Sequence, residues 1–195
     1  MRKSDPASAK KERNKTVRWV VTIFFVTILV SGVISLLSDV IMEGSNMIIA
    51  FLILLGIILI GIIFDIIGMA VATADEKPFH SMASRKVKGA HEAIRLLRNA
   101  ERVSSICNDV VGDICGVVSG SASATIAAQI MANMEFTWPQ IISLVMSSLV
   151  AGLTVGGKAV GKTVAVNSCT KIVHSVGQLI HWLNHLPDMF RKKKK

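Results

Sequence analysis

Cysteine is scarce in the chain, and the sequence contains no recognisable catalytic motif. Its three cysteines, Cys107, Cys115 and Cys169, match no metal-binding spacing. No arrangement of a nucleophile with a neighbouring base is recognisable in the sequence. The sequence therefore gives no support for an enzyme, and we expect the cysteines to be packing residues.

Polar side chains are absent from Met47–Phe64, a run of eighteen residues. A helix that is hydrophobic on every side is typical of a membrane span, and about twenty residues cross the hydrocarbon core. Three further spans are predicted at Trp19–Leu37, Val103–Met131 and Pro139–Val160. The sequence thus predicts an all-α integral membrane protein with about four transmembrane helices.

Lys and Arg are absent from two connecting segments, Ser38–Asn46 and Ala132–Trp138. Basic residues instead gather before the first span, between Lys77 and Arg102, and after the last span. This asymmetry predicts that both termini and the central loop are cytoplasmic in a plasma-membrane protein. The net charge of +9 is then explained by topology and by attraction to anionic lipid, with no role in binding nucleic acid.

The predicted spans are flanked by segments of different character. Residues 1–16 are basic and predicted to be disordered, and residues 187–195 form a basic tail. Residues 17–41 form an additional N-terminal transmembrane helix, which is favoured over a cleaved signal peptide because no A-x-A-type site follows it. Ser84–Arg98 and Lys171–Phe190 each have one apolar helical face, so both are predicted to lie along the cytoplasmic membrane surface.

Four ionisable residues lie inside the predicted spans. Asp109 and Asp113 are four residues apart in the third span, Asp65 lies in the second and Lys158 in the fourth. Counting about 1.5 Å per helical residue places all four in the cytoplasmic half of the bundle. Ionisable groups within a membrane are costly, which indicates either an ion pathway or a charge pair.

Small residues recur every four positions in two of the spans. Gly112, Gly116 and Gly120 line one strip of the third span, and the pairs Gly152–Gly156 and Gly157–Gly161 line the fourth. Such strips allow helix backbones to approach closely. Close packing, within one subunit or between two, is the simplest interpretation of these glycines.

The segment Gly156–Thr163 matches the P-loop pattern Gly-x-x-x-x-Gly-Lys-Thr, with Lys162 as its lysine. A P-loop must follow a strand and open a helix within an α/β domain. This segment instead ends a membrane span. We therefore expect no nucleotide site here.

Several motifs together resemble the transmembrane domain of the cyclin-M/CorC-type magnesium transporters. Gly89–Leu97 reads Gly-Ala-x-x-Ala-x-x-Leu-Leu, as in that family, and Asn99–Arg102 resembles its Asn-Pro-Glu-Arg. Phe64–Gly68 falls where the family has Phe-Ser-x-x-Glu, and Gly157–Ala165 falls on its Gly-Glu-Ile-x-Pro-Lys-x-x-Ala. The resemblance covers residues 47–186 in matching order and implies a dimeric membrane domain that transports Mg²⁺.

The chain departs from this family at the residues that would hold the ion. The resemblance places Asp65 at the family's serine and Lys158 at its glutamate, while Val110-Val111 replaces a Gly-Asn and Gly161 replaces a proline. A lysine cannot ligate Mg²⁺, which requires oxygen ligands.

CBS regulatory domains, which usually follow in the family, do not occur before the end of the sequence. A separate cytoplasmic regulatory protein is therefore an expected partner.

Two functions remain open at this point. In the first, the protein transports a cation such as Mg²⁺ through a divergent site, with Asp65, Asp109 and Asp113 as ligands. In the second, it is a non-conducting relative in which the Lys158 ammonium replaces the bound cation, and it acts as a structural or regulatory membrane partner. Either way the expected partners are the lipid bilayer and a second copy of the chain. The other candidate site residues are Asn108, Gly157, Gly161 and Lys162.

Overall fold

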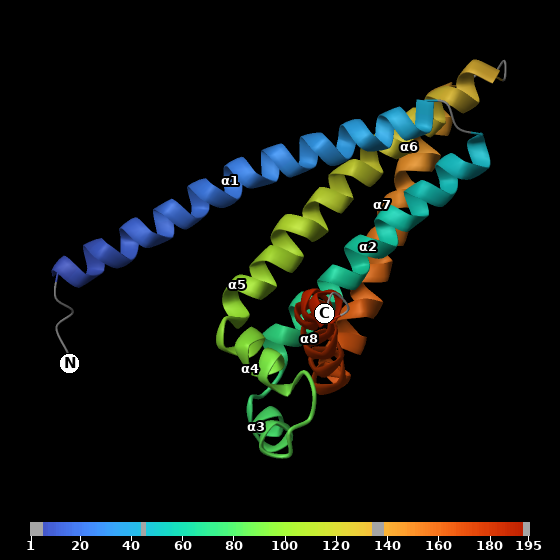
Figure 1. The fold of residues 1–195 in the computed structure, drawn as a ribbon. Coiled ribbons are helices and arrows are strands. Elements are labelled where there is room, and N and C mark those ends of the chain that lie inside the picture. Colours follow the sequence, from blue (N-terminus) through green and yellow to red (C-terminus); the bar gives the residue numbers. More distant parts are fainter. Residues whose placement is uncertain (1–5, 44–45, 134–138, 193–195) are drawn as a thin grey trace.

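The computed structural model describes residues 6–43, 46–133 and 139–192, and every regular element in these ranges is a helix (Figure 1). Four helical segments are long and apolar enough to cross a membrane. The shortest has 22 residues and covers about 33 Å at 1.5 Å per residue, which exceeds the hydrocarbon thickness of about 30 Å. The predicted all-α, four-span fold is thereby confirmed. The four segments are Val17–Ser38, Met47–Thr73, Ala100–Ala132 and Gln140–Asn167.

Helix α1 (Pro6–Glu43) contains the first span and is largely uncovered by the rest of the molecule. Ile23 and Val30 pack against a cluster on the third span that includes Ile114 and Val118. Towards its N-terminus α1 diverges from the other helices (Figure 1). Its remaining apolar side chains, such as Phe25, are exposed and suited to contact lipid.

Two helix ends differ from the sequence prediction. Helix α1 begins at Pro6, so it includes most of the leader that was predicted to be disordered. Proline is favoured at the first helical position, and the alanines, lysines and glutamate that follow are good helix formers. Helix α8 (Cys169–Lys192) continues through Pro187, where the sequence predicted the start of the basic tail.

The core of the bundle is formed by three helices, α2 (Met47–Thr73), α6 (Asp113–Asn133) and α7 (Pro139–Asn167), which lie side by side (Figure 1). A buried cluster joins Leu54 and Ile58 of α2, Ile126 of α6 and Val150 of α7. These side chains interlock towards the end of the bundle at which α2 begins. The opposite half of the three helices contains the charged residues.

The third span is not one continuous α-helix. It consists of α5 (Ala100–Ser105), a π-helical segment η1 (Ile106–Gly112) and α6. A π-helix is wider than an α-helix and is often found at functional sites. Because its turns contain more residues, η1 changes the direction in which the following side chains point, and Asp109 lies within it.

A separate layer of three helices covers one end of the bundle, and we call it the end layer. It comprises α3 (Lys77–Ser84), α4 (Ala90–Arg98) and α8. Phe79 of α3, Ile94 of α4 and Val173 of α8 are buried together with apolar side chains of α2 and α7. The sequence predicted amphipathic helices at Ser84–Arg98 and Lys171–Phe190, which correspond to α4 and α8, whereas α3 was not predicted.

The boundaries in the end layer differ from those predicted. The expected helix Ser84–Arg98 begins only at Ala90, and Lys77–Ser84 is a helix of its own. Lys86 and Gly89 have φ angles of 55° and 82°, which interrupt any helix that would pass through them. The chain turns at this point, so α3 and α4 face each other.

Candidate functional site

The candidate site lies where α2, η1 and α7 cross. Lys158 projects from α7, and its Nζ lies 3.9 Å from Oδ1 of Asp65 on α2. The same Nζ donates a hydrogen bond of 3.4 Å to the carbonyl oxygen of Gly112, the last residue of η1. The Asp65 side chain is 7% exposed and that of Lys158 is 22% exposed. One ammonium therefore joins three spans.

Glycines allow the helices to meet closely at this crossing. A Cβ atom at Gly112 would lie 3.3 Å from Lys158 Nζ, and one at Gly61 would lie 2.8 Å from the Cβ of Cys115. Gly157 lies against Ile62 and Gly161 against Ile66, so both glycines of α7 face α2. The predicted site residues Gly157 and Gly161 thus bring Lys158 within reach of Asp65.

Two buried oxygen atoms at the crossing have no hydrogen-bond partner among the described residues: Oδ2 of Asp65 and Oδ1 of Asn108. The Asn108 amide packs against Gly68 of α2, about one turn beyond Asp65, and its Nδ2 donates to Ser104 Oγ at 3.3 Å. Leaving a buried acceptor unsatisfied costs about 1–3 kcal/mol. Oxygens of this kind are ligands for a hard cation or acceptors for water.

Asp109 and Asp113 do not join Asp65 and Lys158. Both are exposed on the outer side of the third span, and Asp109 accepts a hydrogen bond of 2.8 Å from Ser105 Oγ. Within residues 6–43, 46–133 and 139–192, no three side chains of the His, Cys, Asp or Glu type are grouped so that they could hold a metal ion. The four charged residues lie at similar depths, which permitted a single cluster. The third span is rotated about its axis so that Asp109 and Asp113 point away from Asp65 and Lys158.

Lys162 lies one turn beyond Lys158 on α7 and is exposed. Helix α7 runs without interruption from Pro139 to Asn167, so Gly156–Thr163 is helical throughout. In the part of the chain that the structure describes, no strand precedes this segment. The geometry that a P-loop requires is therefore not formed here.

One polar contact between α8 and α4 was not predicted from the sequence. His181 Nδ1 lies 2.8 Å from Oε1 of Glu92, and both side chains are partly buried. Burial alone would raise the pKa of Glu92, but the hydrogen bond and the attraction of His181 outweigh it and lower that pKa. The contact joins residues 89 positions apart, so no local pattern could have indicated it.

Comparison with protein-family models, with curated proteins and with solved structures found no match to this chain. The fold itself defines the class: a helical protein with four candidate membrane spans. The resemblance to the cyclin-M/CorC-type transporters depends on the sequence motifs alone.

Proposed function

We propose that this chain is a non-conducting membrane protein in which the Lys158 ammonium takes the place of a bound cation. The observation that supports this most directly is the position of Lys158 Nζ between Asp65 Oδ1 and the Gly112 carbonyl. Carboxylate and carbonyl oxygens are the ligands that a hard cation would use. In this proposal the protein serves as a structural or regulatory partner within the plasma membrane.

The charge balance at the crossing favours this proposal over transport of a divalent ion. Asp65 contributes one negative charge and Lys158 one positive charge, so the pair is neutral. Mg²⁺ requires near-octahedral oxygen coordination and gives up its water ligands reluctantly. Since Asp109 and Asp113 are exposed elsewhere, the crossing presents a single carboxylate to an incoming ion.

Flux through reconstituted liposomes tests the proposal. Wild-type protein should not increase entry of Mg²⁺, Mn²⁺ or Na⁺ above that of protein-free liposomes. Saturable influx that Asp65→Asn abolishes would instead establish transport.

Cation transport is the second candidate, and the unpartnered oxygens of Asp65 and Asn108 favour it. If Lys158 moved away from the crossing, the Asp65 carboxylate and the Gly112 carbonyl would be left to a cation, and the Asn108 amide would lie about one turn further along α2. Such a site would have one net negative charge and would suit a monovalent cation better than Mg²⁺. The liposome experiment with Na⁺ separates this candidate from the closed site.

We further propose that the protein is a homodimer that uses the glycines left open in the single chain. A Cβ atom at Gly116, Gly120, Gly152 or Gly156 would meet no atom within 4 Å, in contrast to the glycines at the crossing. Strips of small residues on a lipid-facing surface are typical contacts between membrane helices. The open part of α7 is thus available to a second copy.

Gly156→Leu should therefore shift the protein from dimer to monomer in mild detergent, as measured by light scattering coupled to size-exclusion chromatography. The bulky side chain would keep two helix backbones apart. Gly32→Leu is the matched control, because Gly32 on α1 also has open space around it. A wild-type protein that is monomeric in several mild detergents would contradict the dimer.

We also propose that the end layer is cytoplasmic, as the distribution of basic residues indicates. In a background in which Cys107, Cys115 and Cys169 are replaced by alanine, Asn46→Cys should react with a membrane-impermeant maleimide on intact cells. Ser84→Cys should react only after permeabilisation. Both positions are exposed, so accessibility is decided by the side of the membrane. Labelling of Ser84→Cys on intact cells would show that the orientation is reversed.

A further inference from the structure

A pocket of about 390 Å³ lies between α3 and α4 in the end layer, and we call it the α3–α4 pocket. It is partly open to its surroundings, and its size is within the range of small-molecule sites. Only Ala83 and Ile94 contribute apolar side chains to it. Its lining residues are His80, Ala83, His91, Ile94, Arg95, Arg98 and Asn99.

The lining is rich in groups that recognise anions. His91, Arg95 and Arg98 are spaced by four and three residues, so they lie along one face of α4, opposite the face that buries Ala93 and Leu97. His80 approaches from α3 and completes the set. No acidic residue lines the pocket. Among the described residues, neither guanidinium forms an ion pair.

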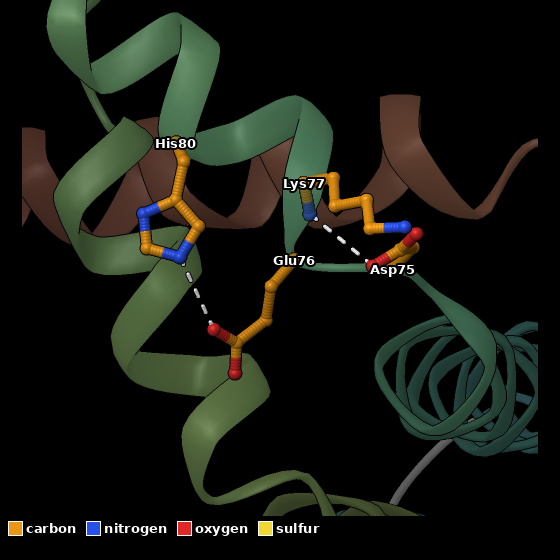
Figure 2. A network of polar contacts seen from close by, with 4 residues as sticks. All are labelled: Asp75, Glu76, Lys77 and His80. Carbon is orange, nitrogen blue, oxygen red and sulfur yellow. Dashed lines mark hydrogen bonds and ion pairs between the residues drawn. The ribbon is translucent and has the colours of Figure 1, made fainter.

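One carboxylate lies close to the pocket without lining it. Glu76 Oε2 is 3.3 Å from Nε2 of His80, one turn away on α3 (Figure 2). Asp75, beside it, accepts a hydrogen bond of 3.2 Å from the backbone N–H of Lys77. Glu76 contacts His80 and forms no ion pair with either arginine among the described residues, so the lining itself carries the two positive charges of Arg95 and Arg98.

The pocket lies beside the start of a membrane span. Asn99 directly precedes Ala100, where the third span begins, and its Nδ2 donates to the Arg95 carbonyl at 2.9 Å. One turn further, the Arg102 guanidinium lies 5.4 Å from the centroid of the Trp19 ring. Tryptophan is enriched at the membrane interface. The pocket is thus at the depth at which lipid headgroups lie.

We propose that the α3–α4 pocket binds a phosphate monoester. Two arginines present donor pairs that match phosphate oxygens bidentately, and a monoester carries close to two negative charges at neutral pH. A carboxylate would neutralise only one of the two guanidinium charges. Basic pockets at the cytoplasmic end of membrane helices bind phosphorylated headgroups by the same chemistry.

The test uses the full chain in phosphatidylcholine nanodiscs, with thermal stability as the readout of binding. One arm adds phosphatidic acid to the nanodisc, and the other adds free glycerol 3-phosphate, which carries the same monoester in water. Phosphatidylglycerol, a diester with one charge, is the lipid control. Stabilisation by phosphatidic acid alone assigns a lipid headgroup, and stabilisation by glycerol 3-phosphate assigns a soluble ligand.

The double variant Arg95→Gln/Arg98→Gln should bind the stabilising monoester at least about tenfold more weakly, because it removes both guanidinium groups that donate charge-assisted hydrogen bonds to the phosphate. Both side chains are exposed, so folding should be unaffected, and His91→Gln provides a second, milder variant. The control Arg85→Gln/Lys88→Gln removes the same charge from exposed positions outside the pocket and should bind as wild type does. The proposal is overturned if neither monoester stabilises wild type, if phosphatidylglycerol stabilises it equally, or if both double variants lose the same affinity.

Discussion

Lys158→Met should lower the free energy of unfolding by about 3–5 kcal/mol, the usual cost of removing one partner from a buried ion pair. The substitution leaves the carboxylate of Asp65 buried without its cation, and it leaves the Gly112 carbonyl without its donor. Thermal unfolding of the purified protein in detergent provides the measurement. A stability close to that of wild type would show that the ammonium is not part of the closed crossing.

Two further variants separate the ion pair from general effects of the substitution. Lys162→Met removes an exposed lysine one turn away and should change stability by no more than about 0.5 kcal/mol. The double variant Lys158→Met/Asp65→Asn removes both charges and should recover much of the loss, since the buried charge no longer lacks a partner. Failure of this recovery would indicate that Lys158 acts through packing alone.

Metal ions distinguish the two candidate functions in the same assay. Lys158→Glu places a second carboxylate near Asp65, so the variant should be unstable in metal-free buffer and gain stability when Mg²⁺ is added. The gain is expected to be about 2.7 kcal/mol at an ion concentration of 100 times Kd. Wild type should gain nothing from Mg²⁺. If instead millimolar Mg²⁺ stabilises wild type while Lys158→Met is harmless, the protein holds an ion and the transport function is correct.

Gly89→Ala should destabilise the protein by about 3 kcal/mol through the contact between α4 and α8. Gly89 has a φ of 82°, and a Cβ atom there would lie 2.5 Å from the backbone nitrogen of Gln178. The obstructing atoms are backbone and cannot rotate away. Left-handed φ angles cost non-glycine residues about 1–3 kcal/mol, and overpacking adds a similar amount.

Limited proteolysis of the variant would show whether α8 has detached, and thermal unfolding would give the size of the effect. Gly177→Ala should act in the same direction, because its Cβ would meet the Gly89 carbonyl oxygen and Ala93. Gly32→Ala on α1 is the control, since its Cβ would meet nothing within 4 Å and alanine is the better helix former by about 1 kcal/mol. Equal stability of all three variants would exclude a tight α4–α8 contact.

The sequence by itself determined the four spans, because an apolar run of membrane length can be satisfied only by a helix that crosses the bilayer. It also placed Lys158 at a depth where Asp65, Asp109 or Asp113 could be its partner, without deciding among the three. Position along a helix converts directly into depth at about 1.5 Å per residue, and these charges fall at compatible depths. The glycine spacing on α7 likewise indicated a close helix contact.

Rotation about the helix axis was decided only by the tertiary structure. Asp109 and Asp113 match Asp65 in depth, yet the π-helical segment η1 and the packing of α6 on α2 leave them exposed on the outer side. Which glycines are covered and which are open also depends on that rotation. The α3–α4 pocket has the same origin, since the turn at Lys86 and Gly89 brings His80 to the arginines of α4. The depth of a residue in the membrane follows from its position along the helix. The direction in which its side chain points results from packing between helices that are distant in the sequence.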